Sequence, residues 1–554
     1  MKLQITNCKT ALFLLAASRQ HAHALGTGGH DVCSNSRSIL ETNVDVVIIG
    51  AGMAGLAAAH KLEAHGVKFV LLEGRDQVGG RIRKKENFGS GVTIEDGANW
   101  ILSGEDNPIF QLANKYGLNY STCDFGNAET FFKNGTRVSD EYNREAYKRF
   151  NSAKQCLFDY GEEFNRQEGN HDEGVDVGSR AIMEQCGWSP EDEVDRVVEW
   201  MGLDFGAASP DHVSLYTVPD DSFTDFTPEN WLGDWNFVVD DRGFEHIAVE
   251  YAAELKTSPQ LAKEVYLVEW DDIRDDAELS PGKVSAFDYV TEACYRYNAK
   301  KVISTVSVGV LENRPDLFSP NLPTAKMDSN PFKMGVFCKV YFQFPEKFWG
   351  DKEVINMAVS DRNQGKCNVW YNLDLFKPGS NILFCMITDE IVGEMGIDSD
   401  FFYLDESMLD GILEPLRNIY GSAYVSPLAQ YYPNWPNDAW TYGSFEKWQL
   451  GRKLSEYEIF AAPLENKKGM NVVHFSGSAT CRRYDGWVHG AFFSGERTAN
   501  YVLEELGVQV GDDIWSACDW EDGWDDEEDD WEDDWDGVEE EESKSDDVES
   551  TMAV

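Results

Sequence analysis

The sequence predicts a mixed α/β protein built on a Rossmann-type dinucleotide-binding domain, and two observations point to it. Residues 44–49 (V-D-V-V-I-I) form a short β-branched run, which is typical of a buried parallel strand. The run leads directly into the pattern G-x-G-x-x-G at Gly50, Gly52 and Gly55. Because 554 residues exceed what one core usually holds, we also expect a second domain of the α+β class.

The elements after this strand follow in the order that a dinucleotide-binding unit requires. The three glycines permit, in turn, a tight turn, backbone approach to a diphosphate, and close packing of the next helix on the strand. Residues 53–64 are rich in alanine and predict that helix, and residues 69–72 predict a second strand. Glu73 ends this strand, 23 residues after Gly50, where a carboxylate that binds ribose hydroxyls is expected.

Residues 79–83 read G-G-R-I-R and decide between two cofactors. Nicotinamide-binding units have no particular need of this extension. It resembles the second half of the signature of FAD-binding amine oxidases, in which an arginine near the flavin phosphates follows a glycine pair. The resemblance implies FAD rather than NAD as the cofactor, with Arg81 as a phosphate or flavin contact.

A second part of the chain carries the same resemblance. Residues 96–100 read D-G-A-N-W, and in flavin amine oxidases a G-A-x-W segment lies beside the isoalloxazine ring. Glycine lets the backbone press on the ring, and tryptophan supplies a flat apolar wall. The family also holds adenine with a backbone valine, which corresponds here to Val265 in a predicted strand at 263–268. The resemblance therefore implies five more cofactor contacts, which are Gly97, Ala98, Asn99, Trp100 and Val265.

Three further segments resemble the polyamine-oxidase branch of this family. They are F-C-K-V-Y-F-Q-F-P at 337–345, Y-G-S-F at 442–445, and the stretch from F-S-G at 475–477 to Y-D-G-W-V-H-G-A at 484–491. In that branch a lysine holds a water molecule against flavin N5, and two rings flank the substrate nitrogen. The resemblance gives the first role to Lys339 and the second to Phe445 and Trp487. It also implies three cofactor contacts, at Trp448, Ser478 and Val488.

Several residues depart from the pattern of the family. Ser444 stands where the monoamine-oxidase branch carries the cysteine that links flavin, so we expect FAD to be bound non-covalently. Ser478 stands where most members have a glutamate near the cofactor, which predicts a lower affinity for FAD. Leu102 and Gly206 fall where plant polyamine oxidases carry acids that bind the distal ammonium, and Phe337 replaces a tyrosine. These departures argue against spermine-like specificity.

The motifs alternate along the chain, so the predicted domains are discontinuous. Residues 140–200 have helical spacing, residues 213–239 read as strand-rich, and residues 312–465 read as mainly antiparallel strands. Later strands are predicted at 301–306 and 472–476, and a final helix at 491–506. We expect an FAD-binding domain at 44–130, 241–311 and 466–508, and a substrate domain at 131–240 and 312–465.

The N-terminus predicts export. Residues 1–24 have a charged start, a short apolar middle and an A-x-A ending, which are the parts of a secretory signal peptide. Residues 25–43 are expected to form an unstructured leader. An organellar transit peptide and a plain disordered start remain alternatives to secretion. The chain has no run of about 18 or more apolar residues, so we expect no transmembrane segment.

The formal net charge of −50 restricts the partners. Nucleic acid is excluded as a partner because phosphate binding needs basic surface, whereas a cationic small molecule is attracted. Residues 509–554 interleave tryptophan with acids and are expected to be a disordered tail, with a helix that docks on a protein partner as the alternative. The 11 cysteines show no C-x-x-C spacing, which argues against a zinc site.

These inferences together predict an FAD-dependent amine oxidase of the polyamine-oxidase type, with a cationic amine and dioxygen as its partners. The resemblance implies hydride transfer to flavin N5 and release of hydrogen peroxide. An L-amino-acid oxidase on the same fold is one alternative, and it requires an arginine that faces the substrate carboxylate. A catalytically weak flavoprotein that acts as a binding module through its tail is another.

Overall fold

The computed structural model describes residues 32–33, 39–104, 106–166, 178–190, 192–203, 212, 214, 234–271, 280–358, 366–388, 404–510 and 518. The predicted signal peptide lies outside these residues, and so does the predicted tail apart from residues 509, 510 and 518. Residue contacts divide the chain into Met1–Asp519 and Trp520–Val554, and every described residue belongs to the first unit.

The predicted dinucleotide-binding fold is built on an eight-stranded sheet, in which β12, β9, β10, β11, β1 and β2 lie in that order. β1 (Ile39–Ile49) pairs in parallel with β2 (Phe69–Leu72) on one side and with β11 (Ala293–Ser304) on the other. β21 (Asn471–Phe475) also pairs in parallel with β11, so strands from three distant parts of the chain meet in one sheet. The prediction of a mixed α/β fold is confirmed.

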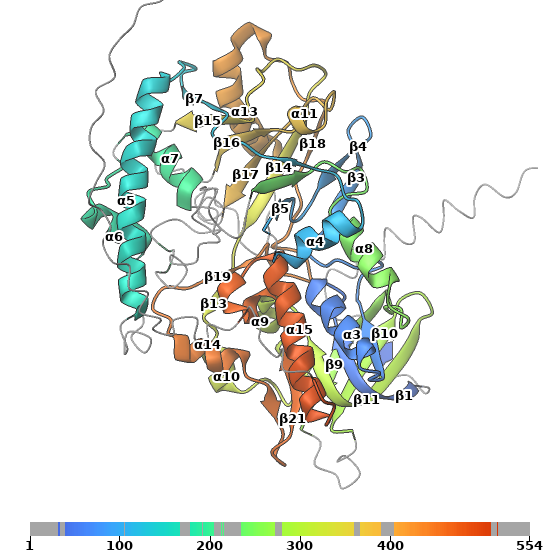
Figure 1. Cartoon of the computed structure of the whole chain (residues 1–554). Coiled ribbons are helices and arrows are strands. Elements are labelled where there is room, and N and C mark those ends of the chain that lie inside the picture. The colour runs from blue at the N-terminus through green and yellow to red at the C-terminus, as the bar shows by residue number, and fades with distance from the viewer. Residues whose placement is uncertain are drawn as a thin grey trace, which may run out of the picture. The chain divides into compact units, whose positions relative to one another are not determined.

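Two helices lie side by side against this sheet (Figure 1). They are α3 (Met53–Ala64), which has the predicted bounds, and α15 (Val488–Glu505). The backbones touch, because a Cβ placed on Gly495 would lie 2.2 Å from the carbonyl oxygen of Ala54. α15 begins three residues before the predicted start at 491.

The predicted leader is shorter than expected. β1 begins at Ile39, where it pairs with Cys294 of β11, and Cys33 forms a disulfide with the same cysteine. Residues 39–43 are therefore part of a strand and not of an unstructured leader. Their sequence, I-L-E-T-N, lacks the continuous apolar character of residues 44–49, because four of the five are exposed on this extension of the sheet.

The second sheet has six strands in the order β18, β14, β17, β16, β15 and β7. Its pairings are antiparallel except for β7 with β15. Alternation along β14 (Phe337–Gln343) gives the sheet two different faces. Val340 and Phe342 pack in the cluster that holds α13 (Glu406–Tyr420), whereas Tyr341 belongs to a cluster on the opposite face. Lys339 shares the side of Tyr341.

The expected helical region is present as α5 (Asp140–Arg166), α6 (Ser179–Gln185) and α7 (Glu193–Leu203). A disulfide joins Cys156 of α5 to Cys186 at the end of α6. Of the strand-rich stretch predicted at 213–239, the described residues contain one strand, β8 (Trp235–Val238). β8 lies between β5 (Trp100–Leu102) and β6 (Tyr120–Thr122) in a small antiparallel sheet.

Shorter elements complete the described part of the chain. The remaining strands are β3 (Lys84–Phe88), β4 (Val92–Glu95), β7 (Ala128–Phe132), β9 (Lys263–Glu269), β10 (Gly282–Asp288), β12 (Phe318–Ser319), β13 (Phe332–Met334), β15 (Val354–Ala358), β16 (Lys366–Asn372), β17 (Ile382–Thr388), β18 (Ala429–Tyr431), β19 (Glu446–Trp448) and β20 (Leu464–Glu465). The remaining helices with assigned bounds include α4 (Pro108–Lys115), α8 (Glu245–Ala253), α9 (Val308–Asn313), α10 (Thr324–Asp328), α11 (Leu373–Phe376) and α14 (Leu454–Ala461).

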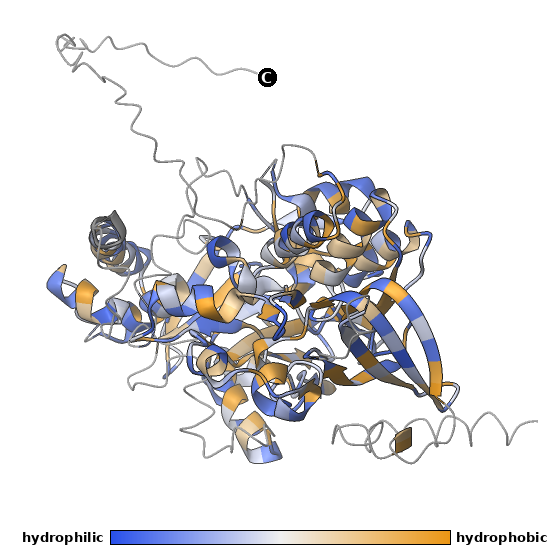
Figure 2. Cartoon of the chain, turned by 90° about the horizontal axis from the view of Figure 1, so that it is seen from below, coloured by the Kyte–Doolittle hydropathy of each residue, from blue (hydrophilic) through white to orange (hydrophobic). Residues whose placement is uncertain are grey.

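Hydrophilic and hydrophobic residues alternate along the helices (Figure 2). Among the described helices, none combines the length and the apolar character that crossing a membrane requires. Two further disulfides join Cys367 to Cys385 and Cys481 to Cys518.

Candidate active site

A cavity of about 320 Å³ joins the glycine turn of the first sheet to the face of β14 that carries Lys339. It is lined by residues from every segment that the sequence singled out. Most of the predicted site residues lie on its wall: Gly50, Gly52, Glu73, Arg81, Gly97, Ala98, Asn99, Trp100, Val265, Lys339, Phe445, Ser478, Trp487 and Val488. Residues more than 400 positions apart in the sequence thus meet in one cavity.

One end of the cavity has the geometry of a diphosphate site. Helix α3 begins there, and its N-cap residue, Gly52, has no side chain to satisfy the free N–H groups of the first turn. A Cβ on Gly80 would lie 3.4 Å from the Cα of Gly52, so side chains at these positions would fill the space beside the turn. Free N–H groups and the helix dipole favour an anion at this place, and the residues present fit the phosphates of a dinucleotide.

Glu73 is held against the glycine turn by backbone N–H groups. Its carboxylate accepts hydrogen bonds from the backbone N–H groups of Ala51, at 2.8 Å, and Arg75, at 2.9 Å. Burial raises the pKa of Glu73, against the effect of these two donors. The carboxylate is therefore fixed beside the glycine turn, on the wall of the cavity, where ribose hydroxyls can reach it.

Gly55 does not line the cavity but has the packing role that the pattern predicted. A Cβ at this position would lie 1.9 Å from the carbonyl oxygen of Gly50, far inside contact distance. The helix can lie this close to β1 only because residue 55 has no side chain. Gly50 itself has φ of +99°, a left-handed conformation that favours glycine.

Lys339 reaches the cavity from the middle of β14. Its Nζ donates to the side-chain oxygen of Asn99 at 2.8 Å and to the carbonyl oxygen of Gly97, so it holds the segment expected beside the flavin ring. The residue is 3% exposed, and burial lowers the pKa of its ammonium, against the attraction of Glu95 and Asp96. Burial likewise raises the pKa of Glu95. A buried lysine with a lowered pKa on a cavity wall is characteristic of a functional site.

Aromatic rings form the wall at the Lys339 end. The ring centroids of Phe337 and Phe445 are 5.5 Å apart, and those of Trp235 and Trp487 are also 5.5 Å apart. Trp100 meets Trp235 with a centroid distance of 6.3 Å and an edge-on geometry. This part of the cavity is suited to enclose an uncharged or weakly hydrated group between flat apolar surfaces.

The cavity also has residues that the sequence reasoning missed. Trp235 was overlooked, although it opens the strand β8 that pairs with the strand of Trp100. Arg75 was overlooked as well, and its guanidinium binds the carboxylate of Asp438 at 2.6 Å. Asp438 is also 3.2 Å from Arg83, so one carboxylate ties two arginines of the nucleotide-binding segment to the second part of the chain. No local pattern marks the two arginines as partners of Asp438, because that carboxylate lies about 360 positions away in the sequence.

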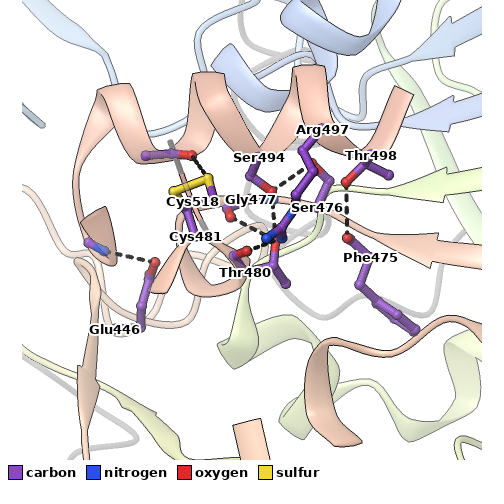
Figure 3. Close-up of a disulfide and its surroundings, with 12 residues drawn as sticks. Glu446, Phe475, Ser476, Gly477, Thr480, Cys481, Ser494, Arg497, Thr498 and Cys518 are labelled. Carbon is purple, nitrogen blue, oxygen red and sulfur yellow. Dashed lines mark hydrogen bonds between the residues drawn. A yellow bond between two sulfur atoms is a disulfide. The ribbon is translucent and has the colours of Figure 1, made fainter. Parts of the chain in front are cut away.

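The loop that carries Ser478 is held by side chains of α15. The hydroxyl of Ser494 accepts from the backbone N–H of Gly477 at 3.0 Å and lies 2.7 Å from the hydroxyl of Thr480. The disulfide between Cys481 and Cys518 then fastens the far end of the loop, as Figure 3 shows. The loop is therefore fixed at both ends beside the cavity.

Trp448 is, besides Gly55, a predicted cofactor contact that does not line the cavity. It is 4% exposed and packs edge-on against Phe332, with ring centroids 5.2 Å apart, in the core below the cavity. β19 begins directly after Phe445, and strand alternation turns residues 446 and 448 away from the side of Phe445. Leu102 is likewise buried at 2% exposure and off the cavity wall, and Gly206 lies outside the described residues.

Trp448→Phe is accordingly expected to leave the affinity for FAD unchanged. The smaller ring leaves part of the volume beside Phe332 empty, so the free energy of unfolding should fall by about 1–2 kcal/mol. Titration of the apoprotein with FAD, followed by flavin fluorescence, and thermal unfolding measure the two effects separately. A clear loss of affinity at an unchanged melting temperature would return Trp448 to the cofactor site.

Comparisons with known proteins agree with this geometry. Residues 53–503 match the family model of the flavin containing amine oxidoreductases. Polyamine oxidase 1 of Zea mays is 30% identical over 477 residues, which cover 83% of this chain and 90% of the relative. Polyamine oxidase 7 of Oryza sativa subsp. japonica is 30% identical over 475 residues, covering 81% and 93%. Lysine-specific histone demethylase 2 of Homo sapiens is 25% identical, and the match covers 53% of that protein.

The fold has solved counterparts. A structure of wild-type putrescine oxidase bound to putrescine superposes with a TM-score of 0.65 at 20% identity, covering 84% of this chain and 100% of the other. The chain therefore belongs to the flavin-containing amine oxidoreductase family, whose members oxidise CH–NH donors with oxygen as the acceptor.

Proposed function

We propose that the protein is a polyamine-oxidase-like amine oxidase that binds FAD non-covalently and forms hydrogen peroxide. The observation that carries the proposal is that Lys339, Phe445 and Trp487 line the same cavity as the glycine turn, although they come from three distant segments. Ser444 cannot form the thioether that a cysteine would, and its hydroxyl instead bonds with the backbone of Phe337, at 2.9 and 3.1 Å.

The cofactor, when bound, supplies the acceptor for a hydride from the carbon next to the amine nitrogen. The residues of the chain hold it by its two ends. The N-terminus of α3 and Arg81 would hold the phosphates, Glu73 would hold the ribose, and Val265 would contact the adenine, since all of them lie at the cavity. Gly97 and Trp100 form the wall beside the ring system, in a segment that Lys339 holds in place.

The aromatic wall prepares the amine. Phe445 and Trp487 exclude water from the nitrogen, which favours the neutral amine over the ammonium ion because burial disfavours charge. The neutral nitrogen has the lone pair that assists cleavage of the adjacent C–H bond. Lys339 would hold a water molecule at its Nζ. Hydrolysis of the product imine adds one water and gives an aldehyde and the cleaved amine.

An L-amino-acid oxidase requires an arginine that is free to face a carboxylate. The described cavity wall contains Arg75, Arg81 and Arg314, and each is paired with an acid of the chain. Their partners are Asp438 at 2.6 Å, Glu446 at 2.8 Å and Asp316 at 3.1 Å. The geometry therefore favours an amine without a carboxylate. The alternative of a binding module depends on the tail, which lies outside the described residues.

The test is anaerobic mixing of the purified protein with a panel of amines. Bleaching of the flavin by di- and polyamines supports the proposal, and peroxide should then appear on admission of air. Bleaching by amino acids alone would instead establish the L-amino-acid oxidase, and no bleaching by any amine would favour the binding module.

Trp487→Leu is expected to slow reduction of the flavin by the best amine by about tenfold, because one wall of the desolvated site is lost. The spectrum of the bound flavin should change little. Stopped-flow absorbance of the anaerobic reaction measures the rate, and Trp448→Phe is the matched control, since it changes a buried tryptophan off the cavity wall. Equal rates in the wild type and Trp487→Leu would remove Trp487 from the amine site.

We also propose that the protein passes through an oxidising compartment, consistent with secretion. Its support is the four disulfides found among the described residues, since disulfides are rare in reducing compartments. Intact-mass measurement of the exported protein tests this, and a product that still begins at Met1 would remove the signal-peptide interpretation.

A further inference from the structure

Glu446 is a buried carboxylate that neither the glycine pattern nor the family resemblance singled out. Its side chain is 1% exposed. One oxygen, Oε2, accepts from Arg81 Nη1 at 2.8 Å, and the other, Oε1, accepts from the backbone N–H of Gly486 at 3.2 Å. The hydroxyl of Ser478 is hydrogen-bonded to the same side chain. Figure 3 shows the side chain of Glu446 with its hydrogen bond from a backbone nitrogen.

The three partners of this carboxylate belong to two of the segments that build the site. Arg81 follows the glycine pair of the nucleotide-binding unit, Ser478 lies in the cofactor loop, and Gly486 directly precedes Trp487. Glu446 itself directly follows Phe445. Glu446 does not line the cavity, but its neighbours do, so it can act on the cofactor and on the amine only through them.

The carboxylate is charged in the folded protein. Burial alone would raise the pKa of Glu446, but the guanidinium of Arg81 and the hydrogen bond from Ser478 bring it below its usual value. Removal of one member of a buried charged pair leaves the other without compensation. Arg81 would then lose its charged partner and keep two neutral contacts, with the carbonyl oxygen of Ser444 and the hydroxyl of Ser478.

The side chain of Ser478 contacts the same guanidinium as Glu446 does. Its Oγ accepts from Arg81 Nη2 at 2.9 Å, so a carboxylate at position 478 would reach the same guanidinium from the other side. Two carboxylates cannot both be buried there beside one arginine without repulsion. Glu446 and a glutamate at position 478 are therefore alternative ways to supply one negative charge to this site.

We propose that Glu446 is a positioning residue that holds Arg81 for the cofactor phosphates and fixes Phe445 and Trp487 relative to each other, in place of a carboxylate at position 478. This inference rests on flavin binding by the family and not on which amine the protein oxidises. The lower FAD affinity expected from Ser478 is accordingly offset by Glu446.

The first test is Glu446→Gln. The amide keeps the shape of the side chain and loses its charge, so FAD should bind about tenfold more weakly, a loss typical of one charge-assisted hydrogen bond. Flavin fluorescence on titration of the apoprotein measures the affinity without any turnover. An affinity equal to that of the wild type would overturn the proposal.

Glu199→Gln is the matched control for this variant. Glu199 is also a fully buried carboxylate bound to an arginine, with 2.7 Å to Arg180, and it lies in α7 away from the cavity wall. This control should lower the melting temperature and leave the FAD affinity of the folded protein unchanged. An equal loss of FAD affinity in both variants would show that buried charge in general, and not Glu446, is responsible.

The second test exchanges the charge between the two positions. Ser478→Glu alone should weaken FAD binding because it places a second carboxylate beside Glu446. The double variant Ser478→Glu/Glu446→Ser should recover the affinity to within about threefold of the wild type, a non-additive result that identifies direct coupling. If the double variant binds FAD no better than Ser478→Glu, the inference is wrong. This comparison also decides the matter if Glu446→Gln does not fold.

The two proposals fail in different ways. If the amine panel gives no bleaching but the exchange restores FAD affinity, the amine assignment fails and the role of Glu446 stands. If amines bleach the flavin but the exchange does not restore FAD affinity, the oxidase assignment stands and Glu446 is an ordinary core residue.

Discussion

Lys339→Met is expected to lower the rate of flavin reduction by the best amine by about a hundredfold, which is the lower end of what a positioned proton-transfer group contributes. Methionine retains much of the volume and apolar stem of the side chain but cannot donate to Gly97 and Asn99 or hold a water molecule. FAD should stay bound, because the contacts at the glycine turn are unchanged. The yellow colour of the variant and its slow bleaching in anaerobic stopped flow are the two readouts.

The pH dependence of the same variant tests the cause. Burial lowers the pKa of Lys339, with Glu95 and Asp96 opposing the shift, so the lysine loses its proton at a lower pH than an exposed lysine does. A step that needs the uncharged Nζ of Lys339 therefore becomes faster as the pH rises through this lowered pKa. The wild-type rate should show that rise, and the profile of Lys339→Met should keep only the rise that comes from deprotonation of the substrate amine. A variant that reduces its flavin at the wild-type rate across the pH range would exclude the assigned role.

Lys326→Met provides the control for a buried lysine outside the site. Lys326 is 5% exposed, and burial lowers its pKa to about 7. Its Nζ donates to backbone carbonyl oxygens, including that of Ala462 at 2.6 Å, and it does not line the cavity. The control should lower the melting temperature and leave the rate of flavin reduction per bound flavin unchanged.

The part of the site that could be predicted from the sequence is the part that local geometry determines. The strand, turn, helix and second strand between residues 44 and 73 were placed correctly, because each follows from residues within a few positions of it. Short-range rules of this kind need no knowledge of the rest of the fold. Lys339 was singled out by the family resemblance instead, and the alternation seen along β14 in the structure puts it on the side opposite α13.

The errors arise where a partner lies far along the chain. The extension of β1 to Ile39 depends on pairing with residues 294–298, and no sequence pattern within residues 39–43 indicates a strand. Trp448 was expected at the cavity because its segment contains Phe445, which lines it, and the alternation of β19 could not be followed without its pairing to β13. Glu446 was missed because its role depends on its contact with Arg81, which lies 365 positions away in the sequence.

Gly55→Ala is expected to abolish stable FAD binding with the smallest possible change of side chain. The added Cβ would lie 1.9 Å from the carbonyl oxygen of Gly50, and either α3 or the turn must move. The turn is itself closely packed, since a Cβ placed on Gly50 would lie 2.4 Å from the hydroxyl of Thr305. The turn is also held by a hydrogen bond of 2.7 Å from the Gly50 N–H to the carbonyl oxygen of Leu72. It therefore has little freedom to move. Movement of α3 carries the free N–H groups of its first turn away from the phosphates.

The free energy of unfolding should fall by about 1–3 kcal/mol, as for other overpacked cores, while FAD affinity falls by about a hundredfold or more. Gly411→Ala is the control, since Gly411 lies exposed inside α13 with no atom within 4 Å of an added Cβ. Alanine there should be neutral or slightly stabilising, because glycine is a poor helix former. Affinity is measured well below the melting temperature, so that loss of FAD cannot be attributed to unfolding. A yellow Gly55→Ala protein with wild-type affinity would show that the cofactor does not depend on this turn, and both proposals for the cavity would lose their foundation.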